Sequence, residues 1–118
     1  IYNIHLQSNW IKTMKSSYQN RVSEAVKIKK HIDKSPFPVV VCGDFNDTPI
    51  SYTYSSIKKG LNDSFQESGI GIGNSYVNIP TLRIDYILHS KKYKSFNYEK
   101  HKYKFSDHYP ISCDLLIP

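Results

Sequence analysis

The chain has 118 residues, 39% of them hydrophobic, which suits one domain with a buried core and excludes a disordered tail. Its longest apolar runs are far shorter than the roughly 18 residues that a membrane-spanning helix needs. The formal net charge is +6, and a basic surface attracts polyanions such as nucleic acid, anionic lipid headgroups or phosphorylated small molecules, although a solvated lysine-rich surface explains the same charge.

The first half of the chain predicts a strand, a long helix and a second strand. Residues 1–7 are predicted to form a strand ending near His5, followed by a loop through Asn9 and Trp10. A helix is predicted over about residues 16–34, because its apolar residues recur three or four positions apart and form one stripe. The stripe consists of Tyr18, Val22, Ala25, Ile28 and Ile32. Residues 39–43 form a β-branched apolar run, typical of a strand covered on both faces.

The second half predicts a short helix and several strands. Thr48 and Pro49 are typical of a helix start, and Gly60 is typical of its end. A glycine-rich loop follows at 69–73, with a short strand suggested at 75–77. Further strands are predicted at 82–89, 93–99 and 109–117. Cys42 and Cys113 lie in apolar runs and are interpreted as core thiols, since two cysteines are too few for a disulfide framework.

This order of elements predicts an α+β fold with one mixed, mostly antiparallel sheet and helices on one face. We expect residues 1–118 to belong to a single domain. Strands that are apolar on both sides need a second covering layer. The sequence supplies helices for one face only, so the cover of the other face is expected to be missing.

Polar residues gather at the predicted strand ends: His5, Asp44 with Asn46, and Asp107 with His108, while Asp85 lies within a strand. Carboxylates, an amide and imidazoles from several strands of one sheet are groups that a hydrolytic site uses. Asp44 and Asn46 are two positions apart, so in extended backbone their side chains point the same way and together can hold a water. An Asx turn at the end of the strand is the alternative, since Asp and Asn favour such turns.

Asp107 and His108 are adjacent, so each needs its own partner. A carboxylate such as Asp107 suits a hard divalent cation such as Mg²⁺. His108 titrates near neutral pH and can serve as a base or as the charge partner of a phosphate oxygen, with Asp85 as the carboxylate that orients its ring. The alternatives are a surface histidine at 108 and a salt bridge from Arg83 to Asp85.

Four segments, in this order, resemble the endonuclease/exonuclease/phosphatase superfamily of deoxyribonuclease-I-like, metal-dependent phosphoesterases. The segments are Asn3-Ile4-His5-Leu6, Gly43-Asp44-Phe45-Asn46, Arg83-Ile84-Asp85-Tyr86-Ile87 and Ser106-Asp107-His108-Tyr109-Pro110. The resemblance covers essentially the whole chain, but only the C-terminal half of the family's domain. That domain is a four-layer α/β sandwich, so the resemblance implies that this chain forms half of the sandwich.

The resemblance also implies a role for each site residue. Asp44 would activate a water for in-line attack, and Asn46 would stabilise the charge that develops on the phosphate. Asp85 would orient His108, which would contact the scissile phosphate. His5 would contact the phosphate as well and matches a histidine that donates a proton in some members of the family.

A metal site is implied in the same way. Its ligands would be Asp107, Asn46 and Asp44, and the cofactor would be Mg²⁺ or Mn²⁺. The family's principal metal-binding glutamate lies in its N-terminal half, and the glutamates of this sequence match no family motif. We therefore expect the isolated chain to bind metal weakly, to turn over little substrate and to expose an apolar sheet face.

The function expected from this resemblance is hydrolysis of a phosphoester. A nuclease-type phosphodiesterase is favoured because of the basic charge; the alternatives are a lipid or inositol-phosphate phosphoesterase and a non-catalytic module that binds nucleic acid. Loops 47–54 and 69–80 would line the approach to the site, where Tyr52 and Tyr54 could stack on bases. The partner implied is the N-terminal half of the same domain, while no specific protein partner and no cellular location are predicted.

Overall fold

The computed structural model describes residues 1–8, 14–103 and 105–118, and the predicted loop through Asn9 and Trp10 lies outside them. The described elements, in chain order, are β1 (Tyr2–His5), α1 (Met14–Asp33), β2 (Val40–Asp44), α2 (Tyr52–Lys58), β3 (Leu61–Asp63), α3 (Ser64–Ser68), β4 (Asp85–Ser90), β5 (Lys94–Lys100) and β6 (Ile111–Leu116). Within those ranges, no helix combines the length and the apolar character needed to pass through a bilayer.

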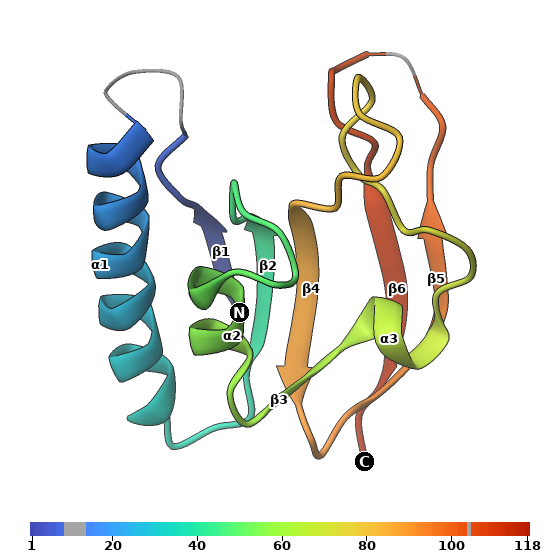
Figure 1. Cartoon of the computed structure of the whole chain (residues 1–118). Coiled ribbons are helices and arrows are strands. Elements are labelled where there is room, and N and C mark those ends of the chain that lie inside the picture. Colours follow the sequence, from blue (N-terminus) through green and yellow to red (C-terminus); the bar gives the residue numbers. More distant parts are fainter. Residues whose placement is uncertain (9–13, 104) are drawn as a thin grey trace.

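A four-stranded sheet, in the order β1-β2-β4-β3, forms the centre of the molecule (Figure 1). β1 and β2 run parallel, whereas β4 is antiparallel to both of its neighbours, β2 and β3. β5 and β6 pair with each other as a separate two-stranded sheet, and β6 contacts β4. The predicted α+β fold with a mixed, mostly antiparallel sheet is therefore confirmed, but the last two strands form a second sheet instead of extending the first.

The long helix and the short α2 pack on one face of the four-stranded sheet. Their buried side chains form one hydrophobic cluster with those of the sheet. The cluster includes Ala25 and Ile32 of α1, Ile57 of α2, Val41 of β2 and Leu88 of β4. Burial of a Val, Leu or Ile side chain contributes about 1.5–3 kcal/mol, so this cluster holds the helices against the sheet.

The apolar stripe predicted for α1 is present only in the C-terminal part of the helix. Ala25 and Ile32 are buried, but Tyr18 is 44% exposed. Near the start of α1 the buried positions are instead Ser17 and Arg21. The reason is that this end of the helix lies over polar chain segments, described below, and no longer over the apolar strands.

The other face of the sheet carries half-buried apolar side chains and no covering layer of described residues. They line a hollow of about 580 Å³ between the two sheets. The lining includes Val40 and Cys42 of β2, Ile87 of β4 and Ile111, Cys113 and Leu115 of β6. Both cysteines are free thiols at this open face, so their predicted place in the core is wrong. The expectation of an uncovered apolar face holds for the part of the chain that the structure describes.

Several local features differ from the sequence prediction. β3 and α3 were not predicted, because a three-residue strand and a five-residue helix are too short to show a periodic pattern. α2 begins after Ser51, whose side chain accepts a hydrogen bond from the Tyr54 N–H, and not at Pro49. The strand suggested at 75–77 is reduced to a single bridge between Tyr76 and His108.

Candidate active site

Strand pairing brings His5, Asp44 and Asp85 to one edge of the sheet. His5 lies opposite Asp44 in the parallel pairing of β1 with β2. Asp44 in turn lies opposite Asp85 in the antiparallel pairing of β2 with β4. His108 comes from the segment before β6, and its bridge to Tyr76 fixes the backbone at that point. Residues that are far apart in the sequence therefore meet where β1 and β2 end and β4 begins.

Three of these side chains form a compact group, and a fourth lies beside it. Asp44, Asp85 and His108 offer ligand atoms that all lie within 4.8 Å of one another. Nδ1 of His108 is 2.8 Å from Oδ2 of Asp85, and its Nε2 is 3.9 Å from Oδ2 of Asp44. Nε2 of the exposed His5 is 3.6 Å from the same Asp44 oxygen. Asp44 Oδ2 is therefore the point on which two imidazoles converge.

Gly43 allows β1 to approach the strand that carries Asp44. Its φ is +136°, and a Cβ at this position would lie 1.9 Å from the carbonyl oxygen of Ile4. Only glycine accepts both this backbone conformation and this contact. The glycine that precedes Asp44 in the sequence is thus required by the close packing of β1 on β2.

The turn after β2 holds Asn46 against the end of β1. The Asn46 backbone N–H donates to Asp44 Oδ1 at 2.7 Å, and φ of Asn46 is +50°. Its side-chain Nδ2 donates to the carbonyl oxygen of Leu6 at 2.8 Å. The Asx turn that was the alternative for Asp44 and Asn46 is therefore present, and a role of Asn46 in a site remains a prediction. Since an amide nitrogen carries two hydrogens, the bond to Leu6 leaves Asn46 a second donor.

The environment shifts the protonation equilibria of two members of the group. Burial raises the pKa of Asp44, the hydrogen bond from the Asn46 N–H opposes this, and the nearby negative charge of Asp85 raises the pKa further. Burial lowers the pKa of His108, but the hydrogen bond and the charge of Asp85 and the charge of Asp44 outweigh burial, so the pKa is raised overall. The group therefore favours a protonated, cationic His108 between two carboxylates.

Ser75 and Tyr76, which were not predicted as site residues, support the Asp85–His108 pair. The fully buried Ser75 Oγ accepts hydrogen bonds from the backbone N–H groups of Ile84 and Asp85, each at 3.0 Å. The Tyr76 ring packs edge-on against the His108 imidazole, with 5.4 Å between the ring centroids. A serine and a tyrosine after a glycine-rich loop carry no local signal for this role, because it arises only when the loop packs on β4.

A second set of polar contacts joins α1 to the loops of the site. Nε of the buried Arg21 is 3.3 Å from Asp47 Oδ2, and its Nη1 donates to the carbonyl oxygen of Gln7 at 3.2 Å. Glu24 accepts the Gln7 backbone N–H at 2.9 Å. The Tyr86 hydroxyl donates toward the carbonyl oxygens of Asp47 and Arg83, each 2.8 Å away. These contacts hold the segment after β1 and the turn after β2 at a fixed distance.

Arg83 pairs with a different carboxylate from the one considered in the sequence analysis. Its Nη1 is 2.8 Å from Oδ2 of the buried Asp63, and Tyr54 donates to the same oxygen at 2.6 Å. Tyr54 is therefore a core residue and does not line the approach to the site. Asp85 is left for His108, which is the pairing that the sequence analysis expects.

Asp107 is not among the three residues whose ligand atoms converge, although its charge helps to raise the pKa of the adjacent His108. Its side chain is exposed, and the Ser106 hydroxyl lies 3.3 Å from its Oδ1. Its backbone oxygen accepts the Val77 N–H at 2.8 Å, which anchors the segment leading to His108. A role of Asp107 as a metal ligand remains a prediction.

The donor set fits a divalent cation. Carboxylate and amide oxygens are the ligands that Mg²⁺ and Mn²⁺ prefer. Asp44 and Asp85 are close enough that the charge of Asp85 raises the pKa of Asp44, and a cation beside them would relieve this repulsion. Asp44, with the neighbouring Asn46, would hold such a cation, because Asp85 is engaged with His108.

A hollow of about 470 Å³ opens beside Asn46. Its walls come from the two loops expected to line the approach to the site. They include Asp47 and Thr48 from one loop and Tyr76, Asn78 and Ile79 from the other.

The histidines outside the predicted site lie elsewhere: His31 contacts the Tyr2 hydroxyl, His89 lies near Glu67, and His101 contacts Ser112.

Comparison with solved structures shows which proteins share this fold. The structure of a conserved protein of unknown function from Enterococcus faecalis V583 superposes with a TM-score of 0.80 at 18% identity over 98% of this chain and 49% of that one. A mannosyl-6-phosphatase from Bacteroides thetaiotaomicron superposes with a TM-score of 0.66 at 20% identity, over 98% of this chain and 50% of that one. A 3′ phosphatase from Neisseria, bound to a product DNA hairpin, superposes with a TM-score of 0.70 at 16% identity, over 95% of this chain and 59% of that one.

The chain thus spans about half the length of the solved structures that it matches, and these likenesses concern the fold. No curated protein sequence matches it significantly. The family model described as "Endonuclease/Exonuclease/phosphatase family" matches residues 15–108, which include Asp44, Asn46, Asp85 and His108. The chain belongs to the endonuclease/exonuclease/phosphatase family.

Proposed function

We propose that this chain contributes the water-activating and phosphate-binding residues of a divalent-metal-dependent phosphoester hydrolase, most readily of a nuclease-type phosphodiesterase. The observation that carries the proposal is the convergence of Asp44, Asp85 and His108 at one sheet edge. Membership of the family supports phosphoesterase chemistry, and the net charge of +6 supports a polyanionic substrate.

Each residue of the group has a distinct task in this proposal. Asp44 accepts a proton from a water while the oxygen of that water attacks phosphorus in line with the ester bond that breaks. His108, protonated and held by Asp85, donates to a non-bridging phosphate oxygen as charge develops there. Asn46 donates its second side-chain N–H to the same phosphate oxygen.

Two further groups complete the proposed chemistry. His5, whose Nε2 lies 3.6 Å from Asp44 Oδ2 and whose side chain is exposed, is proposed to contact the phosphate. Asp44, Asn46 and Asp107 are the proposed ligands of Mg²⁺ or Mn²⁺. When bound, such a cation supplies positive charge to the phosphate and to the leaving oxygen. The family's other half is proposed to supply the remaining ligand, a glutamate.

The test is hydrolysis by the intact protein with and without Mg²⁺, on supercoiled DNA, sphingomyelin and inositol phosphates. We expect Asp44→Ala to lower kcat by about 10²–10⁴-fold, the range typical of a positioned general base. Asp114→Ala, which removes an exposed carboxylate on β6, is the matched control and should leave kcat unchanged.

The outcomes separate the candidate functions. Loss of DNA cleavage in Asp44→Ala with DNA binding retained supports the nuclease. Cleavage of sphingomyelin or an inositol phosphate alone would assign a lipid or inositol-phosphate phosphoesterase. Binding of nucleic acid with no Asp44-dependent hydrolysis of any substrate would leave a non-catalytic binding module.

A further inference from the structure

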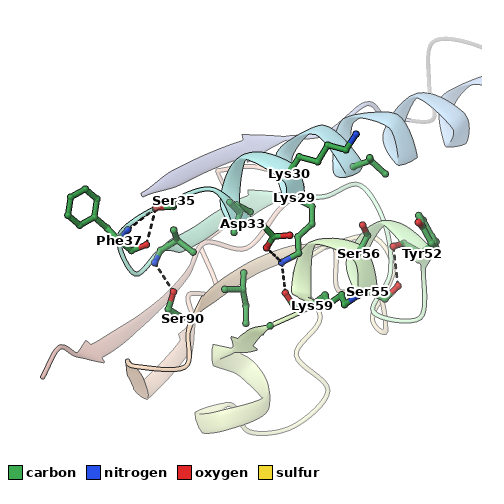
Figure 2. A pocket seen from close by; sticks show the side chains of 15 residues that line it. Lys29, Lys30, Asp33, Ser35, Phe37, Tyr52, Ser55, Ser56, Lys59 and Ser90 are labelled. Atoms are coloured by element: carbon green, nitrogen blue, oxygen red, sulfur yellow. Dashed lines mark hydrogen bonds and ion pairs between the residues drawn. The ribbon is translucent and has the colours of Figure 1, made fainter.

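A groove of about 830 Å³ lies between α1 and α2, on the helix-covered side of the sheet (Figure 2). Its floor is apolar, and lysines stand along its rim. The floor is formed by Val26, Ile32, Val39 and Leu61, and the lysines are Lys29, Lys30 and Lys59. Because the open apolar face is the opposite one, a layer packed there would leave this groove accessible.

The groove carries excess positive charge. Nζ of Lys29 lies 2.6 Å from Asp33 Oδ1 and donates to the Lys59 carbonyl oxygen at 2.5 Å, as Figure 2 shows. Lys29 thus neutralises Asp33, the one carboxylate among the described lining residues, and leaves Lys30 and Lys59 uncompensated. A second hollow of about 490 Å³ shares Lys59 and adds Lys58 and Lys91, so the basic surface continues beyond the end of the groove.

An exposed aromatic ring stands at each end of the groove (Figure 2). Phe37 is 75% exposed and Tyr52 is 55% exposed. Prolines on both sides of Phe37 fix the backbone that presents its ring. Neither ring packs against another aromatic ring of the described residues. Two large apolar rings are therefore held at the surface with nothing in the described part of the chain to cover them.

We propose that this groove binds single-stranded nucleic acid, at a place separate from the catalytic group. Bases offer flat apolar faces that stack on Phe37 and Tyr52, and phosphates pair with the lysines between and beyond the rings. Protein sites that bind single strands without sequence preference combine the same two features, a basic groove and exposed rings. Phe37 precedes the start of β2, whereas Asp44 lies at the end of that strand, so the Phe37 end of the groove is at the edge of the sheet away from the catalytic group.

The other polyanionic partners fit this surface less well. A lipid bilayer presents a flat surface, whereas these lysines and apolar side chains surround a hollow. An acidic peptide needs hydrogen-bond partners for its backbone, but three of the groove's serine hydroxyls are already engaged. Ser35 contacts the Phe37 backbone, Ser55 donates to the Tyr52 carbonyl oxygen, and Ser90 accepts the Val39 N–H.

The test measures binding without catalysis, so its result is independent of the proposed hydrolysis. A fluorescein-labelled oligothymidylate is titrated with the intact protein in EDTA at several salt concentrations, and fluorescence anisotropy gives Kd. The variants are Lys30→Gln with Lys59→Gln, and Phe37→Ala and Tyr52→Ala separately. The charge-matched control is Lys94→Gln with Lys102→Gln, which removes two lysines from the exposed β5 side.

We expect the slope of log Kd against log salt to fall by about 1 for each groove lysine removed, and hence by about 2 in the double variant. Each ring variant should weaken binding by about 5-fold or more, since stacking on an aromatic ring is lost. An equal loss in the Lys94/Lys102 control, or ring variants that bind like the wild type, would overturn the proposal. Groove-dependent binding of phosphatidylserine vesicles or polyglutamate in place of the oligonucleotide would overturn it too.

Discussion

The carboxylate of Asp85 lies 2.8 Å from Nδ1 of His108, although the two residues are 23 positions apart in the chain. Asp85 reaches this place because it is the first residue of β4 and because Ser75 holds its backbone N–H. The bond orients Nε2 of His108 toward the side of the group where Asp44 lies. This pair sets both the protonation and the direction of the imidazole.

The first prediction concerns the charge of His108. Asp85→Asn removes the hydrogen bond to a carboxylate and its negative charge, so the pKa of His108 should fall relative to the wild type. Because the wild-type folded pKa is raised, protonated His108 stabilises the fold below its ordinary value of about 6.5. That stabilisation is lost as pH rises through the folded pKa, and Asp85→Asn should reduce it.

Nuclear magnetic resonance titration of the His108 ring proton measures this pKa, and urea unfolding at several pH values measures the stability. The kcat of Asp85→Asn should fall by about 10²-fold or more, since the imidazole loses its orientation. An unchanged pKa of His108 in the variant would show that the carboxylate does not hold the imidazole in solution.

The second prediction concerns the charge of Asp44. Its pKa is raised in the fold, so the ionised carboxylate is less favourable there than in the unfolded chain. This cost is present above the folded pKa and disappears as pH falls below the unfolded value. Asp44→Asn should therefore raise the free energy of unfolding at pH 7 while hydrolysis is lost. Urea unfolding at neutral and acid pH checks the sign, and a less stable Asp44→Asn at pH 7 would contradict it.

The third prediction concerns Gly43. Gly43→Ala places a methyl group 1.9 Å from the Ile4 carbonyl oxygen at a φ of +136°, so β1 must move away from β2. We expect a loss of about 3 kcal/mol or more in the free energy of unfolding. Gly71→Ala is the matched control, because φ there is also positive, at +82°, but nothing lies within 4 Å of the added Cβ. The control should lower the free energy of unfolding by about 1 kcal/mol. Equal losses in the two variants would argue against the close approach of β1 to β2.

The fourth prediction concerns Arg21, whose side chain is 4% exposed and joins α1 to Asp47 and to the Gln7 carbonyl oxygen. Arg21→Ala leaves Asp47 and this carbonyl without their partner, and we expect a loss of about 3–5 kcal/mol in stability. Arg21→Lys keeps the charge but cannot form both contacts, so it should recover only part of the loss. Chemical unfolding of the three proteins gives the order, and full recovery by lysine would assign the effect to charge alone.

The sequence allowed the meeting of Asp44, Asp85 and His108 at one edge of the sheet to be predicted, because these polar residues lie at or near the ends of predicted strands. Asp44 follows the apolar run 39–42 after a single glycine, and the alternation over 82–89 places Asp85 on the face opposite to Tyr86 and Leu88. The fold class followed from the order of strands and helices. These features depend on local periodicity, which a single sequence displays.

The supporting residues could not be predicted in this way. Ser75, Tyr76 and Arg21 act on the site through contacts between distant segments, and none of them lies in a local pattern that marks such a role. Tyr18 was placed in the core because its spacing matched the apolar stripe of α1, yet that end of the helix covers polar chain. The pairing of β5 with β6 as a separate sheet likewise depends on tertiary packing.

The parallel pairing of β1 with β2 has a consequence for how this protein folds. The hydrogen bond from Asn46 to Leu6 joins residues 40 positions apart. The intervening chain must therefore lose conformational entropy before this contact can form. The hydrogen bonds of α1, by contrast, are local and form early. We therefore expect the catalytic edge to assemble late and to come apart first under mild denaturation, so that hydrolytic activity disappears while the helical circular dichroism signal is still present.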